Sequence, residues 1–362
     1  MSWSDLPADL VAAIADRITD HADFACFRSV CPPWRSASAA HAAGRRVPLL
    51  LLPAEYQLRV DRHLWSLADD SIAAIPLPAA LGFFLFASPR GWALAVDHYF
   101  SAALLHPFTG ASAALPELPP SFRGDLIVRR DTVWDHSPQH AVMIARRTRK
   151  PCSSAAFFCR PGDGSWSPVE CAEEIGQVSS IAYCDGAFYL FDGETRRTIG
   201  VDCETFAVAT VIEPPPVTLI VPDEHLLTWN QPRAESTLVV SSAEDFLVIV
   251  RQQPEGSYGG PGEEVSIEAF CWDRRSWAEV GDIGDRAVFV DSFRGFCVEA
   301  NGVNGVRRNC VYVADASSDG TCTVSVLDLA GLATERLSLG NLGSHRCGRF
   351  WQRPSWSMPN LH

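Results

Sequence analysis

The N-terminal part of the chain carries hydrophobic residues at a helical spacing. Leu10, Ile14 and Ile18 recur every four residues, which keeps them within a stripe of about 80° on one face of a helix. Pro7 falls in the first turn of this pattern, where a residue without an N–H loses no hydrogen bond. The spacing predicts a helix over residues 7–19.

A second hydrophobic stripe stops at a pair of prolines. Phe27 and Cys31 lie four residues apart and predict a second helix. Pro32 and Pro33 each disfavour helical geometry at the preceding residue and remove a backbone donor, so this helix has to end near Val30. Because proline suits the first turn of a helix, the same pair fits the start of a third helix, PWRSASAAHAA. The prolines therefore predict a corner between two short helices.

These three helices lie in residues 1–46, here called the head, and they are too short to enclose much apolar surface. Units of this size usually need a metal, disulfides or a partner. The head shows no metal-ligand spacing, and its two cysteines, Cys26 and Cys31, are separated by little more than one helical turn. We expect the head to present a surface to a partner. The alternative is a small helical cap that packs on the following domain.

After residue 46 the helical spacing gives way to short apolar runs. Examples are GWALAVD, HAVMIARR, GAFYLFD, DFLVIVRQ and NCVYVAD, and Asp-Gly or Asn-Gly pairs typical of hairpin turns lie between such runs. A weak theme recurs in which an apolar strand ends near Asp, a polar turn follows and an aromatic strand returns, as in AFCWDRRSWAEV. Repeated antiparallel units favour a β-propeller, and residues 47–362 would form roughly six to eight blades at about 40 to 50 residues per blade.

The distribution of charge separates the head from the rest of the chain. The 362 residues include 30 basic and 43 acidic side chains, and 47% of all residues are hydrophobic, which is enough to form a core. Residues 1–46 carry five arginines and five aspartates, so the whole net charge of −13 belongs to residues 47–362. This acidic balance argues against nucleic-acid binding, which requires a basic surface.

The sequence shows no sign of export or membrane insertion. Residues 71–89 are uncharged, but Pro76, Pro78 and Gly82 interrupt them, so we expect two buried strands and a turn rather than a membrane span. The first residues lack the basic flank of a secretory signal. The twelve cysteines form no C-x-x-C pair, and we expect reduced, mostly buried thiols in an intracellular protein of the cytoplasm, the nucleus or both.

The head resembles an F-box. The stretches LPADLVAAIADRI and DFACFRSVCPPWRSAS carry the leucine-proline start, the helix stripe and the V-C-x-x-W-R ending of that motif. The resemblance implies that the head binds a Skp-type adaptor, which joins a cullin-RING ubiquitin ligase. Some of the matching residues would form the adaptor surface and others the core of the head: Leu6, Pro7, Leu10, Ile14, Ile18, Val30, Cys31, Trp34 and Arg35.

The remainder of the chain resembles the plant F-box family with a KIB-type, kelch-like propeller at its C-terminal end. The similar stretches, in order, are ASPRGWALAVD, LLHPFTGASAALPELP, WDRRSWAEVGDIGDRAVFV, RRNCVYVAD and WQRPSW. The expected fold class is therefore α+β multidomain, with a three-helix F-box at residues 1–46 and an all-β propeller at residues 47–362.

Common catalytic and metal-binding patterns are absent from the sequence. No G-x-S-x-G, P-loop, G-x-G-x-x-G or H-E-x-x-H motif occurs. His136 and His140 have a spacing that would chelate metal on a helix, but Pro138 lies between them among expected strands, so we expect an exposed loop. The basic run RRTRK at residues 146–150 suits a nuclear address, an acidic-partner contact or, more simply, a charged turn. We expect no cofactor.

Together these patterns favour the substrate-recognition subunit of a Skp–cullin–F-box ubiquitin ligase, a receptor that is not itself an enzyme. The head would bind the adaptor and one propeller face would bind the protein to be modified. The segment PEGSYGGPGEE at residues 254–264, with Tyr258, is either a target-binding loop or a variable insertion. The alternatives are a protein-binding scaffold that recruits no ligase and, from a different class, a propeller enzyme with a helical cap.

Overall fold

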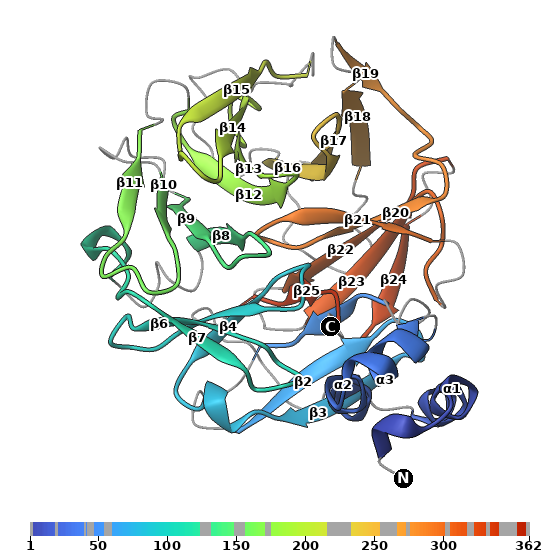
Figure 1. Cartoon of the computed structure of the whole chain (residues 1–362). Coiled ribbons are helices and arrows are strands. Elements are labelled where there is room, and N and C mark those ends of the chain that lie inside the picture. Colours follow the sequence, from blue (N-terminus) through green and yellow to red (C-terminus); the bar gives the residue numbers. More distant parts are fainter. Residues whose placement is uncertain are drawn as a thin grey trace, which may run out of the picture.

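The computed structural model consists mainly of β-sheets that surround a common centre in the manner of propeller blades (Figure 1). The described residues are 3–18, 21–39, 41, 47–53, 60–123, 132–147, 156–170, 175–215, 233–253, 266–272, 276–300, 305–316, 322–330, 334–339 and 353–359. The mainly β architecture that the apolar runs predicted is confirmed.

The three predicted helices are present at the N-terminal end. A 3-10 turn at Trp3–Asp5 precedes α1 (Ala8–Arg17), α2 (His21–Ser29) and α3 (Pro32–Ala37). Cys31 has an extended backbone before α3, and the proline pair fills the first turn of that helix. Residues 32 and 33 therefore form the predicted corner, because they end one helix and begin the next.

Four of the sheets have four strands each. The first contains β1 (Leu49–Leu51), β2 (Asp61–Ser66), β3 (Ser71–Pro76) and β25 (Ser355–Ser357). The second contains β4 (Phe84–Ala87), β5 (Ala93–Val96), β6 (Ala102–Leu105) and β7 (Ser112–Leu115). The third contains β8 (Thr132–His136), β9 (Val142–Arg146), β10 (Ala156–Cys159) and β11 (Ser167–Val169). The fourth contains β12 (Val178–Cys184), β13 (Ala187–Asp192), β14 (Thr198–Asp202) and β15 (Val208–Ile212).

A fifth, nine-stranded sheet combines two groups of strands. One group is β16 (Arg233–Ser242), β17 (Asp245–Gln253), β18 (Ser266–Trp272) and β19 (Trp277–Glu279). The other is β20 (Arg286–Val290), β21 (Gly295–Glu299), β22 (Cys310–Ala316), β23 (Cys322–Asp328) and β24 (Thr334–Ser338). One parallel pair, Val239 with Gly295, joins the groups. Counted separately, they give six blade-like units in the described chain, consistent with the expected six to eight.

The first sheet brings together strands from opposite ends of the sequence. Strand β25 pairs antiparallel with β1, and Leu50 lies opposite Trp356 in the register. The Trp356 side chain is fully buried, and its ring lies 4.9 Å from that of Phe289 in the neighbouring sheet and 6.2 Å from that of Trp65. This pairing closes the ring of sheets.

The head packs on the propeller through one continuous hydrophobic cluster. Its buried members from the helices and from strands of the first two sheets include Val11, Ala15, Phe24, Phe27 and Trp34 together with Leu49, Leu51, Leu64, Leu85 and Ala93. Figure 1 shows α2 and α3 beside β2 and β3. The propeller thus supplies apolar surface that three short helices lack by themselves.

Three expectations from the sequence need correction or comment. Of the two strands expected to be buried in residues 71–89, β4 is buried, but β3 is exposed or half-buried because it forms the outer edge of its sheet. The nine described cysteines are thiols outside disulfide bonds, as expected, but only Cys159, Cys310 and Cys322 are buried, so most of the nine are not. Among the described helices, none has the length and hydrophobicity needed to cross a membrane.

The shared cluster predicts that the head and the propeller unfold together. Phe24 is fully buried, so replacing it by Ala should lower the free energy of unfolding by about 3–5 kcal/mol. Thermal unfolding should still show one transition, shifted to lower temperature for both helical and strand signals. Tyr99→Ala is the control, because the Tyr99 side chain is 76% exposed. A separate, earlier loss of the helical signal alone would contradict the shared core.

Candidate functional site

The structure divides the residues predicted for the adaptor surface into an exposed group and a buried group. Leu10, Ile14 and Val30 are 49%, 39% and 56% exposed. Pro7 and Arg35 are also exposed; Leu6, Ile18 and Cys31 are half-buried against the shared cluster, and Trp34 is buried. Tyr258 lies outside the described residues. The head therefore presents three aliphatic side chains of its predicted set to solvent.

Leu10 and Ile14 are exposed because a different face of α1 packs on the propeller. Val11 and Ala15 are buried, one position along from Leu10 and Ile14, so the buried and exposed stripes are rotated by about 100°. The smaller side chains, Val11 and Ala15, face the shared core, while the larger Leu10 and Ile14 face solvent. Large aliphatic side chains grouped on a small exposed element are typical of a binding surface.

Trp34 supports the head from within. Its ring lies 4.6 Å from that of Phe27, and its indole N–H donates to the carbonyl oxygen of Trp3 at 3.1 Å. Arg28 is buried between α2 and α3, where its guanidinium donates to the Arg35 carbonyl and to the Ser38 hydroxyl, each at 3.1 Å. These bonds fix the helices on either side of the proline corner, and they hold Val30 and Arg35 at the surface.

A buried carboxylate lies at the centre of the propeller. Asp135 on β8 forms an ion pair with Arg90, from the turn between β4 and β5, and its Oδ1 lies 3.4 Å from the Arg294 guanidinium. Its Oδ2 also accepts the backbone N–H of Tyr183 on β12 at 2.7 Å. Arg294 lies in the turn between β20 and β21 and stacks 4.9 Å above the Trp134 ring. One side chain thus connects four sheets.

The charges of this network determine how its groups titrate. Burial alone would raise the pKa of Asp135, but Arg90 and Arg294 outweigh burial and hold that pKa below its usual value. Burial lowers the pKa of Arg294, while Asp135 and Asp291 oppose this change. Asp135 is therefore held as a carboxylate between two guanidiniums.

A second buried aspartate joins this network to the strand that closes the ring. Asp291 accepts the backbone N–H of Trp356 at 2.9 Å on one oxygen, and those of Phe293 and Arg294 at 2.8 and 3.0 Å on the other. Burial raises the pKa of Asp291, and the positive charge of Arg294 opposes the increase. The three hydrogen bonds connect the turn between β20 and β21 to β25.

The prediction that His136 and His140 lie in an exposed loop is wrong for His136, which ends β8 and is buried. His140 lies between β8 and β9 as expected, but it is half-buried, with its ring 4.6 Å from that of Trp92. The His136 imidazole is 1% exposed, and its Nδ1 lies 2.9 Å from the Ser137 carbonyl oxygen, to which it donates. Burial, followed by the charge of Arg90, lowers the pKa of His136 to about 4, so the ring is neutral at pH 7. The part of the chain that the structure describes contains no group of three or more metal-binding side chains.

Sequence reasoning missed the central charges. Asp135 lies between Trp134 and His136 in the buried strand TVWDH, and Asp291 and Arg294 lie between the apolar runs AVFV and GFCV. Isolated charges in apolar runs are a signal for buried ion pairs, since such groups are rarely buried alone. The pairing itself joins Asp135 to Arg294 across 159 positions of sequence, and no local pattern reveals it.

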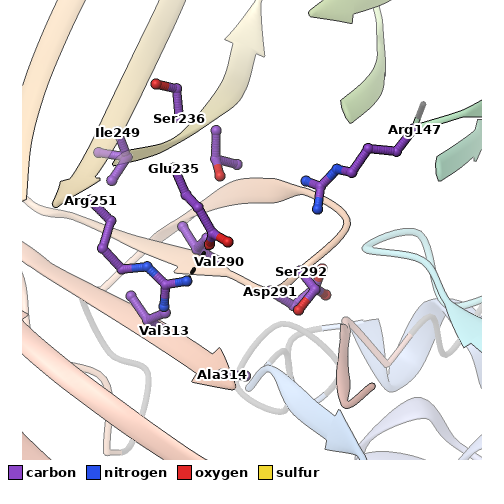
Figure 2. Close-up of a pocket in the computed structure, with 11 residues that line it drawn as sticks. Arg147, Glu235, Ser236, Ile249, Arg251, Val290, Asp291, Ser292, Val313 and Ala314 are labelled. Atoms are coloured by element: carbon purple, nitrogen blue, oxygen red, sulfur yellow. Dashed lines mark hydrogen bonds and ion pairs between the residues drawn. The ribbon is translucent and has the colours of Figure 1, made fainter. Parts of the chain in front are cut away.

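A pocket lies between the two halves of the nine-stranded sheet and the end of β9. Figure 2 shows Arg147 reaching toward the pocket from one side and Glu235 joined to Arg251 on the other. Arg251 also contacts Asp315 at 3.2 Å. The lining further includes Ser236, Thr237, Ile249, Val290, Asp291, Ser292, Val313 and Ala314. The pocket thus combines charged groups, hydroxyl groups and an apolar wall.

A comparison with protein families matches most of the strand-containing part of the chain. A family model described as the KIB1-4 beta-propeller matches residues 64–333, which contain every strand from β3 to β23. "Putative F-box protein At4g22660" of Arabidopsis thaliana is 22% identical over 87% of this chain and 87% of its own length. "Putative F-box protein At4g22170" of the same plant is 24% identical over 99% and 98%. A chain from the crystal structure of a nidogen/laminin complex is 9% identical at a TM-score of 0.41, and the match covers 86% of this chain and 98% of that one.

We expect loss of the Asp135 charge to destabilise the whole propeller. Asp135→Asn leaves Arg294 buried without its closest countercharge, which should lower the free energy of unfolding by about 3–5 kcal/mol in denaturant titrations. The matched control is Glu117→Gln, because Glu117 pairs with Arg123 at 3.2 Å on the surface and should contribute less than about 1 kcal/mol. Equal effects of the two changes would contradict the central role of Asp135.

His136 should make the protein sensitive to mild acid. The unfolded chain takes up a proton on this side chain below its ordinary pKa of 6.5, while the folded chain does not until about pH 4. Stability should therefore fall by about 3 kcal/mol between these values. Urea unfolding of wild type and His136→Asn at several pH values measures this loss, because the variant lacks the titrating ring. Parallel stability curves for the two proteins would show that His136 makes no such contribution.

Proposed function

Because the chain belongs to the KIB1-4 β-propeller family, we propose that it is the substrate-recognition subunit of a Skp–cullin–F-box ubiquitin ligase. The names of the Arabidopsis relatives support an F-box at the N-terminal end, as the sequence predicted. In this role the head binds a Skp-type adaptor and, through it, a cullin-RING ligase in the cytoplasm, the nucleus or both. The propeller binds the protein to be modified.

The chain would contribute proximity rather than catalysis. Binding both the adaptor and the target raises the effective concentration of the target near the ubiquitin carrier, and the transfer chemistry belongs to the partner proteins. In this proposal residues 1–46 and 47–362 are the two functional parts. Their shared hydrophobic cluster would hold the adaptor and the target in a fixed relative orientation.

The exposed aliphatic side chains of the head are the observation that carries this proposal. The core of the head is completed by the propeller, and Leu10, Ile14 and Val30 take no part in it. Folding therefore does not explain why these positions are hydrophobic, whereas a partner surface does. We assign the contact to these three residues with Pro7 and Arg35. Leu6, Ile18, Cys31 and Trp34 support that surface from beneath.

Replacing Leu10 by Asp should weaken binding of the adaptor at least tenfold, because a carboxylate would be buried at the interface. Isothermal titration of the full-length chain with a purified plant Skp-type adaptor measures the change. Leu81→Asp is the matched control, since Leu81 is 48% exposed on the propeller and Leu10 is 49% exposed. Thermal unfolding of both variants should resemble that of wild type.

Two outcomes would overturn the proposal. If the wild-type chain recovers neither the adaptor nor a cullin from plant cells, the ligase role is wrong, and the two alternatives are a protein-binding scaffold and a propeller enzyme with a helical cap. If Leu10→Asp and Leu81→Asp affect adaptor binding equally, the adaptor does not bind the surface assigned here.

A further inference from the structure

The pocket beside β16 and β17 has the features of a site for an anionic group. Two arginines line it from different parts of the chain: Arg147 follows β9 and Arg251 lies on β17. A third, Arg353, precedes β25 and reaches the pocket through a lining residue. Arg353 donates to the hydroxyl of Ser292, a lining residue, at 2.8 Å. Arginines that converge from separate elements are well suited to bind carboxylate or phosphoryl oxygens.

Glu235 already occupies part of this cluster. Its side chain is 53% exposed, whereas that of its partner Arg251 is only 18% exposed, so the carboxylate lies at the mouth and the guanidinium lies deeper. Burial would raise the pKa of Glu235, but the charges of Arg251, Arg147 and Arg353 outweigh burial and lower it. All three arginines therefore favour a negative charge at the position where Glu235 lies.

The Glu235 contact is suited to exchange with an external anion. Ion pairs with a solvent-exposed partner contribute little stability, so an incoming group that makes two hydrogen bonds to the guanidinium can replace it. Asp315 holds Arg251 from another side at 3.2 Å, which keeps the guanidinium oriented when Glu235 moves away. Arg147 is itself held by the Ser179 carbonyl at 3.3 Å. The cationic groups are therefore positioned before a ligand arrives.

The lining also limits the kind of ligand. Ser236, Thr237 and Ser292 offer hydroxyl groups, while Val290 and Val313 provide a short apolar wall. This combination suits one acidic side chain on a polypeptide. A nucleic acid carries a phosphate on every nucleotide, so the net charge of −13 on the chain would repel it far more than it repels one acidic side chain.

We propose that this pocket binds one anionic side chain of the target protein, a glutamate, an aspartate or a phosphorylated residue, which displaces Glu235 from Arg251. This inference rests on the proposed function only in identifying the ligand as part of the ubiquitination target. It assigns Arg147 and Arg251 as the residues that contact the anionic side chain, and Arg353 as a nearby positive charge held by Ser292. Arg147 belongs to the basic run RRTRK, for which the sequence offered contact with an acidic partner as one interpretation. The proposal gives that interpretation a specific side chain.

The test measures binding of labelled peptide pools to the full-length chain by fluorescence anisotropy. The probes are fluorescein-labelled degenerate nonapeptides with a central glutamate, phosphoserine, glutamine or lysine. We expect the glutamate or the phosphoserine pool to bind at least fivefold more tightly than the glutamine pool. A higher affinity for phosphoserine than for glutamate identifies the phosphoryl group as the source of the charge, and comparable affinities identify a carboxylate as sufficient.

Two substitutions should change this binding in opposite directions. Arg147→Gln should reduce the preference for the acidic pools at least threefold, and Arg147→Lys should retain part of it. Glu235→Gln should strengthen binding of the same pools about threefold, because the internal competitor loses its charge. Arg123→Gln is the control, since Arg123 is a surface arginine paired with Glu117 in another part of the chain. Thermal unfolding should confirm that each variant is folded.

The proposal is overturned if the acidic pools bind no better than the glutamine pool, if the lysine pool binds best, or if Glu235→Gln weakens binding. Failure here is distinguishable from failure of the ligase role. Arg147→Gln should bind the Skp-type adaptor like wild type, and Leu10→Asp should bind the acidic peptides like wild type. A loss of adaptor binding alone would therefore leave the pocket assignment intact.

Discussion

The carboxylate of Asp135 connects sheets that backbone hydrogen bonds alone leave separate. Packed sheets contact each other through side chains, so their relative positions depend on how those side chains fit. Arg90, Arg294 and the N–H of Tyr183 reach Asp135 from three other sheets. A buried carboxylate is unfavourable unless it is fully paired, so this group tolerates only the arrangement in which all its partners arrive together. The rest of the ring depends on that arrangement.

Most of the fold could be predicted because local sequence determines its parts. The corner at Pro32 follows from proline chemistry, and the strands follow from short apolar runs with turn residues between them. The buried face of α1 could not be predicted, because periodicity shows which residues share a face but not which face meets the propeller. Val11 is buried and Leu10 exposed for that reason. The burial of His136 likewise depends on partners far away in the sequence.

The surface assigned to the adaptor and the pocket assigned to the target use different physical interactions. Leu10, Ile14 and Val30 offer apolar area, whose contribution to binding depends little on salt. The arginines around Glu235 offer charge, which salt screens and which recognises a particular chemical group. If both assignments hold, one chain combines an attachment to the adaptor that depends little on salt with an attachment to the target that depends on charge.

The pairing of β25 with β1 has a consequence for the order of events during synthesis. Strand β1 leaves the ribosome soon after the head, but its partner is the last described strand of the chain. Until β25 emerges, one edge of β1 lacks its partner and Asp291 lacks the backbone N–H of Trp356. The head packs on that same sheet. A nascent chain therefore exposes an unpaired, aggregation-prone strand edge beside its helices for almost the whole period of translation. During this period we expect chaperones to bind the chain.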